Sequence, residues 1–328
     1  MLPSSEYQSF FQKYSEQHHF DKDPASLYTP INHIMSIGGK RMRPILVLMG
    51  CNIYDEAIEK ALPASLAIEI FHNFTLVHDD IMDAAPLRRG FPTVHHKYGL
   101  SAGILCGDAM VIYAYQYLLQ TNISLSRIQR LMLIFNKMAI EVCEGQMLDM
   151  DFEMRTAVTE QEYMHMIEFK TSVLVGSALE IGAVIGGAKN AESRLLYHFG
   201  CHVGIAFQMK DDILDSFGDP KKFGKKVGGD IAQNKKTLLV IKALESGNEQ
   251  QVATLRNLLE TATTEANESE KIKTVKAIFI STGAKKAVEV LQEKHLEEAF
   301  SILETSMMPK QKRQYLKEWT LSLMQREN

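Results

Sequence analysis

Apolar side chains recur at helical spacing along nearly the whole of this 328-residue chain. In the stretch 288–303, for example, Val288, Leu291, Ala299 and Leu303 fall on one face of a helix. Runs in which apolar and polar residues alternate between turn signals, the pattern of β-strands, are scarce. The sequence therefore predicts an all-α protein.

Residues that break helices gather in a few places. Glycine pairs stand at 38–39 and 186–187, and Gly- and Pro-containing stretches cover 86–92 and 218–229, so we expect loops between helices there. The polar segment 261–271 has the composition of an exposed connection. Composition does not change enough on either side of it to mark a domain boundary, and we expect a single domain over residues 1–328.

Three aspartates follow an apolar helical stretch in the sequence HDDIMD. At about 100° per residue, Asp79, Asp80 and Asp83 fall within an arc of ~100° on one helix. Like charges so close together destabilise a bare helix, and no cation stands within four residues of them. A positive group must therefore come from elsewhere.

The same spacing returns in KDDILD, which places Asp211, Asp212 and Asp215 after a second apolar segment. One such cluster alone is more often a solvated helix face, but two copies after buried-looking helices favour a site. Oxygen-only ligands suit Mg²⁺ together with phosphate oxygens, whereas Zn²⁺ prefers His or Cys in the set. Six clustered acids also serve metals better than the proton transfer of a glycosidase pair.

Basic residues that could bind phosphorylated ligands stand near both clusters. Lys40 and Arg43 follow a glycine pair at i,i+3, and Arg88 with Arg89 follow the first cluster, where adjacent side chains diverge and can meet two anions. A solvated turn or loop is the alternative for each group. The remaining candidates follow an amphipathic stretch or surround the second cluster: Lys170, Thr171, Gln208, Lys225, Lys226 and Lys235.

Composition excludes other classes of partner. A net charge of −4 gives no basic face for a nucleic acid. The four cysteines lie far apart without a CxxC pair, which favours free thiols in the cytoplasm. The N-terminus lacks a basic stretch followed by an apolar run, and no uncharged apolar stretch approaches the ~20 residues of a membrane span.

In chain order, GGKRMRP, DDIMDAAPLRRGFPTVH, EGQMLD, FKTS, FQMKDDILD and the Lys-Gly loop resemble the trans-isoprenyl diphosphate synthases (polyprenyl synthetases). The resemblance covers roughly residues 38–237. It implies the isoprenoid synthase fold, a helical bundle around a central active-site cavity, and usually a homodimer. It also implies a prenyltransferase that joins isopentenyl diphosphate to an allylic diphosphate (dimethylallyl, geranyl or farnesyl) with Mg²⁺, typically three ions.

The resemblance also distributes roles among the residues. The metal ligands are Asp79, Asp83 and Asp211, supported by Asp80, Asp212 and Asp215. Isopentenyl diphosphate is assigned to Lys40, Arg43, His72 and Arg89. The allylic diphosphate is assigned to Arg88, Lys170, Thr171, Gln208, Lys226 and Lys235, where Lys225 is an alternative to Lys226 that the spacing to Lys235 disfavours.

For product length, the family points to Phe74 and Thr75, just before the first cluster. An ideal helical wheel places Thr75 near Asp79 and turns Phe74 away. We expect a C15 to C20 product, with C20 favoured. Two alternatives are a terpene cyclase, which lacks a GGKRMRP site and a second Asp cluster, and a non-catalytic partner subunit, which tends to lose an Asp cluster.

Overall fold

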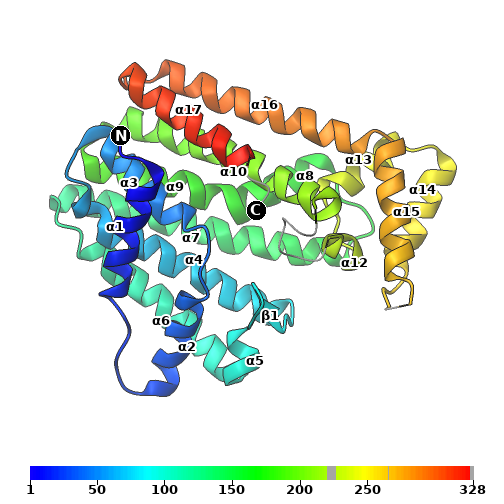
Figure 1. The fold of residues 1–328 in the computed structure, drawn as a ribbon, viewed down its shortest axis with the longest axis horizontal. Helices are drawn as coiled ribbons and strands as arrows, with labels where there is room; N and C mark the ends of the chain where they lie inside the picture. Colours follow the sequence, from blue (N-terminus) through cyan, green and yellow to red (C-terminus); the bar gives the residue numbers. More distant parts are fainter. Residues whose placement is uncertain (220–226, 265, 326–328) are drawn as a thin grey trace. The chain divides into compact units, whose positions relative to one another are not determined.

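The computed structural model describes residues 1–219, 227–264 and 266–325, and these are almost entirely helical (Figure 1). The prediction of an all-α protein is confirmed. The helices are α1 (Ser4–Glu16), α2 (Ala25–Ser36), α3 (Met42–Tyr54), η1 (Ile58–Ala61), α4 (Leu62–Met82), α5 (Val94–Tyr98), α6 (Leu100–Leu119), α7 (Leu125–Met154), α8 (Glu160–Ile167), η2 (Glu168–Ser172), α9 (Val173–Gly186), α10 (Asn190–Phe217), α12 (Gly229–Ala232), α13 (Leu238–Ser246), α14 (Glu249–Glu260), α15 (Glu268–Ser281), α16 (Ala284–Thr305) and α17 (Lys310–Gln325).

The predicted loop 86–92 contains a small hairpin. Its antiparallel strands, β1 (Leu87–Arg88) and β2 (Phe91–Pro92), are the only strands in the part of the chain that the structure describes. Arg89 and Gly90 connect them, and both have positive φ (53° and 81°), as a two-residue type I′ turn requires. The hairpin therefore separates Arg88, in a strand, from Arg89, in a turn.

Internal contacts divide the chain into two compact units. Unit 1 contains Met1–Lys137 and Ser177–Tyr197, and unit 2 contains Met138–Gly176 and His198–Asn328. The expectation of a single domain over residues 1–328 stays a prediction.

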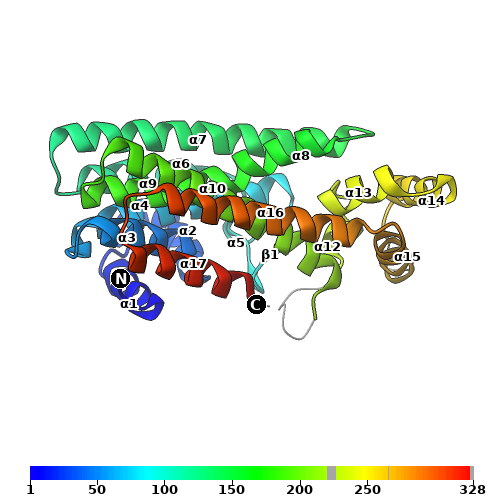
Figure 2. The same cartoon turned by 90° about the horizontal axis from the view of Figure 1, so that it is seen from above.

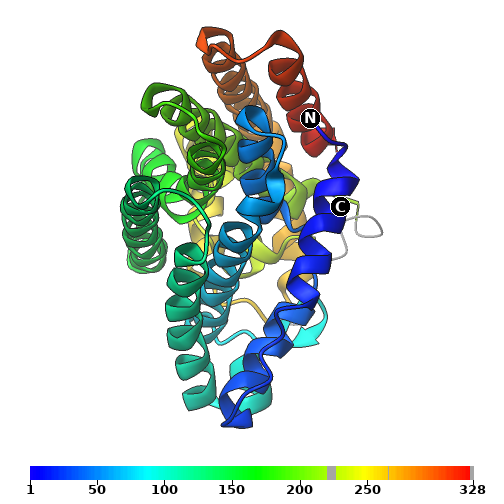
Figure 3. The same cartoon turned by 90° about the vertical axis from the view of Figure 1, so that its left-hand side faces the viewer.

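In unit 1, α4 packs against α3 and α6, and α4 and α6 run side by side in Figure 3. Small residues allow α3 to approach α9 closely. A Cβ on Gly50 would lie 3.1 Å from the Ala183 backbone nitrogen, and a Cβ on Gly182 would lie 2.9 Å from the Cys51 nitrogen. This packing buries the apolar length of α4 and leaves its aspartate-bearing end at the margin of the core.

In unit 2, α16 lies alongside α10 (Figure 2). Its core contains Phe152, Met209, Leu239 and Phe279. The segment η2 is a π-helix, a form that is rare and often found at functional sites. It sits between two glycines: a Cβ on Gly145 would lie 2.7 Å from the Lys170 Cα, and one on Gly204 would lie 2.8 Å from the Ser172 Cα.

The predicted exposed connection at 261–271 is only partly exposed. Lys271 is buried within α15, where its ammonium group donates to Asn234 Oδ1, the Thr261 carbonyl oxygen and Thr263 Oγ1. A buried ammonium group is tolerated because these three acceptors replace water. Composition alone gave no sign of this contact.

Two helical stretches of the described chain are long and apolar enough to cross a membrane by length and composition, although each contains charged residues. They are Leu100–Leu119, whose apolar window is 33% buried, and Glu160–Gly186, whose window is 78% buried. The second has the burial of a core helix in a globular protein. The first has an exposed apolar face.

Candidate active site

The first aspartate cluster stands at the C-terminal end of α4. Asp79 and Asp80 lie in the last turn, and Asp83 is the residue that caps the helix. Arg88 of the hairpin supplies a positive charge that the sequence pattern requires. Its Nε lies 2.8 and 2.9 Å from the two carboxylate oxygens of Asp80, and its Nη2 lies 3.2 Å from Asp79 Oδ2.

Burial raises the pKa of Asp80, although hydrogen bonds from Arg88 oppose that rise. The pKa of Arg88 is raised in turn: burial lowers it, but the hydrogen bonds and charge of Asp80 and the charges of Asp79 and Asp83 outweigh that effect. Carboxylates at a helix C-terminus also meet the negative end of the helix dipole. The cluster is therefore an unfavourable place for three acids unless cations are bound there.

Arg89 points away from Arg88 and toward the glycine pair. Its guanidinium group donates to the Gly38 carbonyl oxygen, and a Cβ on Gly39 would lie 2.6 Å from Arg89 Nη1. Gly39 has φ of 140°, so the backbone passes under the guanidinium group in a conformation that few other residues adopt. The predicted divergence of the two arginines is confirmed.

Arg43 and His72 lie together in the same unit. The distance from Arg43 Nη1 to His72 Nε2 is 3.1 Å, so the guanidinium group donates to the imidazole. Burial lowers the pKa of His72 well below its ordinary value, and the charges of Arg43, Arg89, Arg88 and Arg41 lower it further. His72 is therefore neutral and can accept the hydrogen bond that orients Arg43.

Arg41 has a structural role that the sequence did not reveal. It donates to buried Glu69 and to the Met35 carbonyl oxygen, and Asn73 Nδ2 also donates to Glu69 Oε1 at 3.0 Å. These bonds fix the segment after Gly39 against α4. Lys40 next to it is exposed.

The second aspartate cluster lies in the last two turns of α10, in unit 2. Asp212 is buried, and it accepts hydrogen bonds from the Tyr163 hydroxyl and from Gln208 Nε2 at 3.0 Å. Burial first, and then the charge of Asp230, raise the pKa of Asp212 to about 8. This aspartate faces protein groups, in keeping with a supporting role beside Asp211.

Asp215 fixes the segment that follows the second cluster. Its Oδ2 accepts from the Asp230 backbone nitrogen at 3.0 Å, and its carbonyl oxygen accepts from the Gly228 nitrogen at 2.6 Å. Asp230 is the second residue of α12, and Lys235 follows shortly after that helix. Lys225 and Lys226, the alternatives for one phosphate contact, lie outside the described residues.

A pocket of about 110 Å³ in unit 2 brings together most of the predicted allylic-diphosphate residues. Lys170 Nζ lies 2.5 Å from Asp149 Oδ2, and Thr171 Oγ1 donates to Gln208 Oε1 at 3.3 Å. The polar residues that line the pocket are Asp149, Glu153, Tyr163, Lys170, Thr171, Gln208, Asp212, Asp230, Lys235, Lys236 and Thr237. Of the residues assigned to the allylic site, Arg88 belongs to unit 1.

Tyr163 and Asp230 are site residues that sequence reasoning missed. Tyr163 stands on the apolar face of α8, where its ring is indistinguishable from a core aromatic in the sequence. Asp230 follows the glycine pair 228–229 in GGDIA, and that position after two glycines was its only signal in the sequence. Asp149, the last residue of the EGQMLD motif, is the ion-pair partner of Lys170.

The two residues assigned to product length occupy different faces of α4. The Phe74 ring lies 5.4 Å from that of Phe71 and 4.9 Å from that of His78, within an aromatic cluster. Thr75 donates from Oγ1 to the His72 carbonyl oxygen at 2.7 Å. Phe74 and Thr75 therefore point in different directions from α4, as the ideal helical wheel predicts.

Comparison with protein families and curated proteins gives consistent matches. Residues 24–278 match the polyprenyl synthetase family. The geranylgeranyl diphosphate synthases of Methanosarcina mazei and Sulfolobus acidocaldarius are 43% and 45% identical; each match covers 68% of this chain, and 69% and 68% of those proteins. The short chain isoprenyl diphosphate synthase of Methanocaldococcus jannaschii is 41% identical over 73% of this chain and 72% of that one.

Solved structures agree with these matches. The crystal structure of a geranylgeranyl pyrophosphate synthase matches with a TM-score of 0.95 and 41% identity over 100% of both chains. The enzyme of the same name from Corynebacterium glutamicum, solved with isoprenyl diphosphate and magnesium, matches with a TM-score of 0.85 and 26% identity over 98% of both chains. The predicted isoprenoid synthase fold is confirmed. The chain belongs to the polyprenyl synthetase family and is a short-chain isoprenyl diphosphate synthase, a prenyltransferase.

Proposed function

We propose that this enzyme condenses isopentenyl diphosphate with allylic diphosphates in the presence of Mg²⁺ and makes geranylgeranyl diphosphate as its main product. The observation that carries the proposal is the pairing of each aspartate cluster with cationic side chains: Arg88 beside the first, and Lys170 and Lys235 in the pocket of the second. Such sites bind anions that arrive with metal ions.

Asp79, Asp83 and Asp211 are proposed as the metal ligands, with three Mg²⁺ ions per site as in the family. The donor set fits, because carboxylates are hard oxygen ligands and the Asp79 cluster stands at the negative end of its helix. The Corynebacterium relative was solved with magnesium and isoprenyl diphosphate. When bound, Mg²⁺ would neutralise charge on the departing diphosphate.

The two substrates are proposed to bind to different arginines. Isopentenyl diphosphate is assigned to Lys40, Arg43, His72 and Arg89, and Arg89 contacts the glycine pair that precedes Lys40. Neutral His72 would hold the Arg43 fork in place, so that the fork meets the phosphate with little loss of side-chain entropy.

The allylic diphosphate is assigned to Arg88, Lys170, Thr171, Gln208, Lys226 and Lys235. Lys170, held by Asp149, would stabilise the negative charge that develops on the leaving group as the allylic carbon ionises. The isopentenyl double bond then attacks the cation, and a proton is lost to the diphosphate. None of the described histidines or glutamates is needed as a general base.

A homodimer is also proposed. Leu105, Ile112 and Leu119 are exposed at seven-residue intervals on α6, and Leu133 and Ile140 repeat this spacing on α7. An apolar face of this length is costly to leave in water and is typical of an interface. Light scattering of the purified protein tests the assignment, since a monomer at working concentration would contradict it.

Chromatography of dephosphorylated products tests the proposed function directly. Reactions primed with dimethylallyl, geranyl and farnesyl diphosphate should all converge on a C20 alcohol. A C15 product from the first two primers would correct the chain length. A cyclised hydrocarbon would indicate a terpene cyclase, and no product without an added protein would indicate a non-catalytic subunit.

A further inference from the structure

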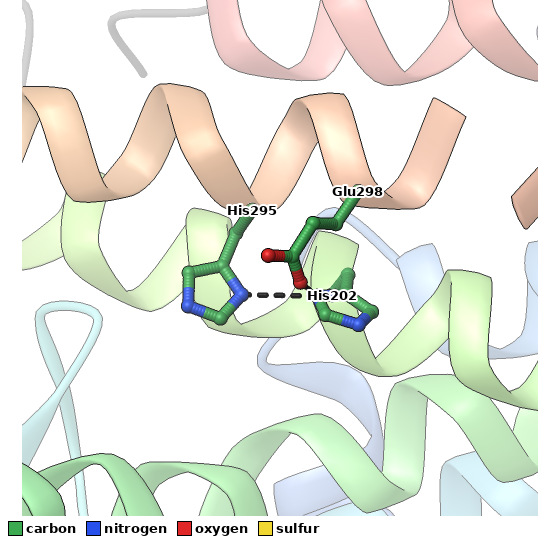
Figure 4. Close-up of side chains that lie close together, drawn as sticks. All are labelled: His202, His295 and Glu298. Atoms are coloured by element: carbon green, nitrogen blue, oxygen red, sulfur yellow. Dashed lines mark hydrogen bonds and ion pairs between the residues drawn. The ribbon is translucent and has the colours of Figure 1, made fainter. Parts of the chain in front are cut away.

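Two histidines and a glutamate that the catalytic account does not use lie together in unit 2 (Figure 4). His202 projects from α10, and His295 and Glu298 project from α16, three residues apart on one face of that helix. His202 Nδ1 is 3.0 Å from His295 Nδ1 and 3.4 Å from Glu298 Oε2. All three ligand atoms lie within 4.8 Å of one another.

These separations are close to those between ligands that share one transition-metal ion. With metal–ligand bonds of about 2.0–2.1 Å, neighbouring ligand atoms stand roughly 3.0 Å apart in octahedral and 3.4 Å apart in tetrahedral coordination. Two of the three distances already meet this requirement. The third would be closed by a small rotation of the Glu298 side chain, which is 46% exposed and also pairs with Lys294 Nζ at 4.0 Å.

The two imidazoles are in the form that binds metals. Burial lowers the pKa of His202 and of His295 below the ordinary value for histidine, so both are neutral near physiological pH. Both rings also line an open pocket of about 440 Å³. Water, or a further side chain of the pocket such as His165 or His198, can therefore complete the coordination.

We propose that His202, His295 and Glu298 form a binding site for a divalent transition-metal ion of the Zn²⁺ class, separate in chemistry from the aspartate clusters. Two imidazole nitrogens and one carboxylate suit Zn²⁺, Ni²⁺ or Co²⁺, whereas Mg²⁺ favours oxygen ligands. The ion would tie α16 to α10, the helix that carries Asp211 nine residues after His202. Its role is to brace that helix.

The alternative is a metal-free contact, in which one imidazole simply donates to the other across the two helices. In the metal-bound case, the ion would take the place of the proton between the two imidazoles. The side chains lie in the same place in both cases, so only the affinity for the metal distinguishes them. The aspartate clusters can also take up Zn²⁺, and binding must therefore be measured with those clusters saturated.

Equilibrium dialysis of the full-length protein against Zn²⁺, in millimolar Mg²⁺, provides the test. We expect one Zn²⁺ per chain that Mg²⁺ does not displace, and a visible absorption band of bound Co²⁺ when Co²⁺ replaces it. Saturation of the site with Zn²⁺ should raise the melting temperature of the protein by about 5 °C, and a chelator should reverse the rise.

Variants decide between the site and the metal-free contact. His202→Ala and His295→Ala should weaken this Zn²⁺ binding at least ~10-fold and abolish the Co²⁺ band. His96→Ala, which removes an exposed histidine of α5, should retain both. If an alanine variant misfolds, Glu298→Gln changes a half-exposed group and should still weaken binding. Unchanged stoichiometry and affinity in all three site variants would overturn the proposal.

The same measurements on Asp79→Asn and Asp211→Asn separate this site from catalysis. Both variants should keep the Mg²⁺-resistant Zn²⁺ ion, because neither aspartate belongs to the His202 cluster. Loss of that ion in either variant would place it at the aspartates and contradict the proposal, whatever the activity of the enzyme.

Discussion

The guanidinium group of Arg88 binds the carboxylate of Asp80 through both oxygens, with Nε at 2.8 and 2.9 Å and Nη2 at 2.7 Å from Oδ1. Asp80 is 1% exposed in this pairing. The contact joins the hairpin to the end of α4 and leaves Asp83, the third member of the cluster, exposed at the helix end. Arg88 therefore organises the first cluster before any substrate is present.

Removing Arg88 should produce a destabilisation that depends on pH. Arg88→Met leaves a buried carboxylate without its cation, which should cost about 2 kcal/mol of unfolding free energy near pH 8. The folded-state pKa of Asp80 is already raised by burial, and it rises further without Arg88. The carboxyl is then protonated as pH falls, so the cost should shrink near pH 5.

Urea unfolding of the apo protein at both pH values measures this effect. Asp80→Asn in the same background provides the control, since an amide needs no cation and should remove the pH dependence. A destabilisation that is equal at the two pH values would mean that Arg88 contributes packing rather than charge.

Arg89 should act on one substrate more than on the other. Its guanidinium group contacts Gly38 and lies over Gly39, away from Asp79 and Asp80. Arg89→Lys replaces a fork with a point charge and should raise the KM for isopentenyl diphosphate several-fold more than the KM for the allylic primer. Arg88→Lys should show the opposite ratio, and equal effects in both variants would refute the division of substrates.

Gly145 should tolerate no side chain. A Cβ there would lie 2.7 Å from the Lys170 Cα, and backbone cannot move aside as a flexible side chain can. Gly145→Ala gains about 1 kcal/mol of helix propensity but should lose more through overpacking, with a net cost of about 1–3 kcal/mol and a lower kcat.

Cys143→Ala, an exposed position on the same helix, serves as the matched control and should change neither quantity. Chemical denaturation and steady-state kinetics measure both variants. Full stability and activity in Gly145→Ala would show that η2 can shift without consequence for Lys170.

Phe74 should limit product length. One more isoprene unit buries four or five carbons, worth roughly 3 kcal/mol when space exists, so removal of an aromatic ring is enough to permit it. Phe74→Ala should shift the product ladder beyond C20, measured by chromatography of the dephosphorylated products. Thr75→Ala tests the neighbouring face of α4, and an unchanged ladder in Phe74→Ala would place the end of the cavity at another residue.

The sequence predicted the fold class because helical periodicity is a local property that recurs along the whole chain. Five of the eleven polar residues that line the pocket were also assigned from the sequence, and these are Lys170, Thr171, Gln208, Asp212 and Lys235. Contacts between distant segments were less accessible. The contact between Arg88 and Asp80 is one example, because it depends on a type I′ turn that folds Arg88 back onto α4.

Residues that look like core also escaped prediction. Glu69 is surrounded in sequence by apolar residues of α4, and only the structure shows that it accepts from Arg41 and Asn73. Tyr163 also looks like a core residue in the sequence, because the role of its hydroxyl depends on the hydrogen bond that it donates to Asp212 on another helix. Helical spacing identifies which face is buried but not which buried polar group meets which partner.

Turnover of Asp79→Asn and Asp211→Asn in saturating Mg²⁺ tests the central claim, that both aspartate clusters serve one metal-dependent ionisation. Each variant should lose several orders of magnitude in kcat while keeping its helical circular dichroism, because an amide preserves the shape of the side chain and relieves the like-charge repulsion within the cluster. Asp151→Asn, which removes an exposed carboxylate of α7, should remain close to wild type. Near-normal turnover in both cluster variants would contradict the account.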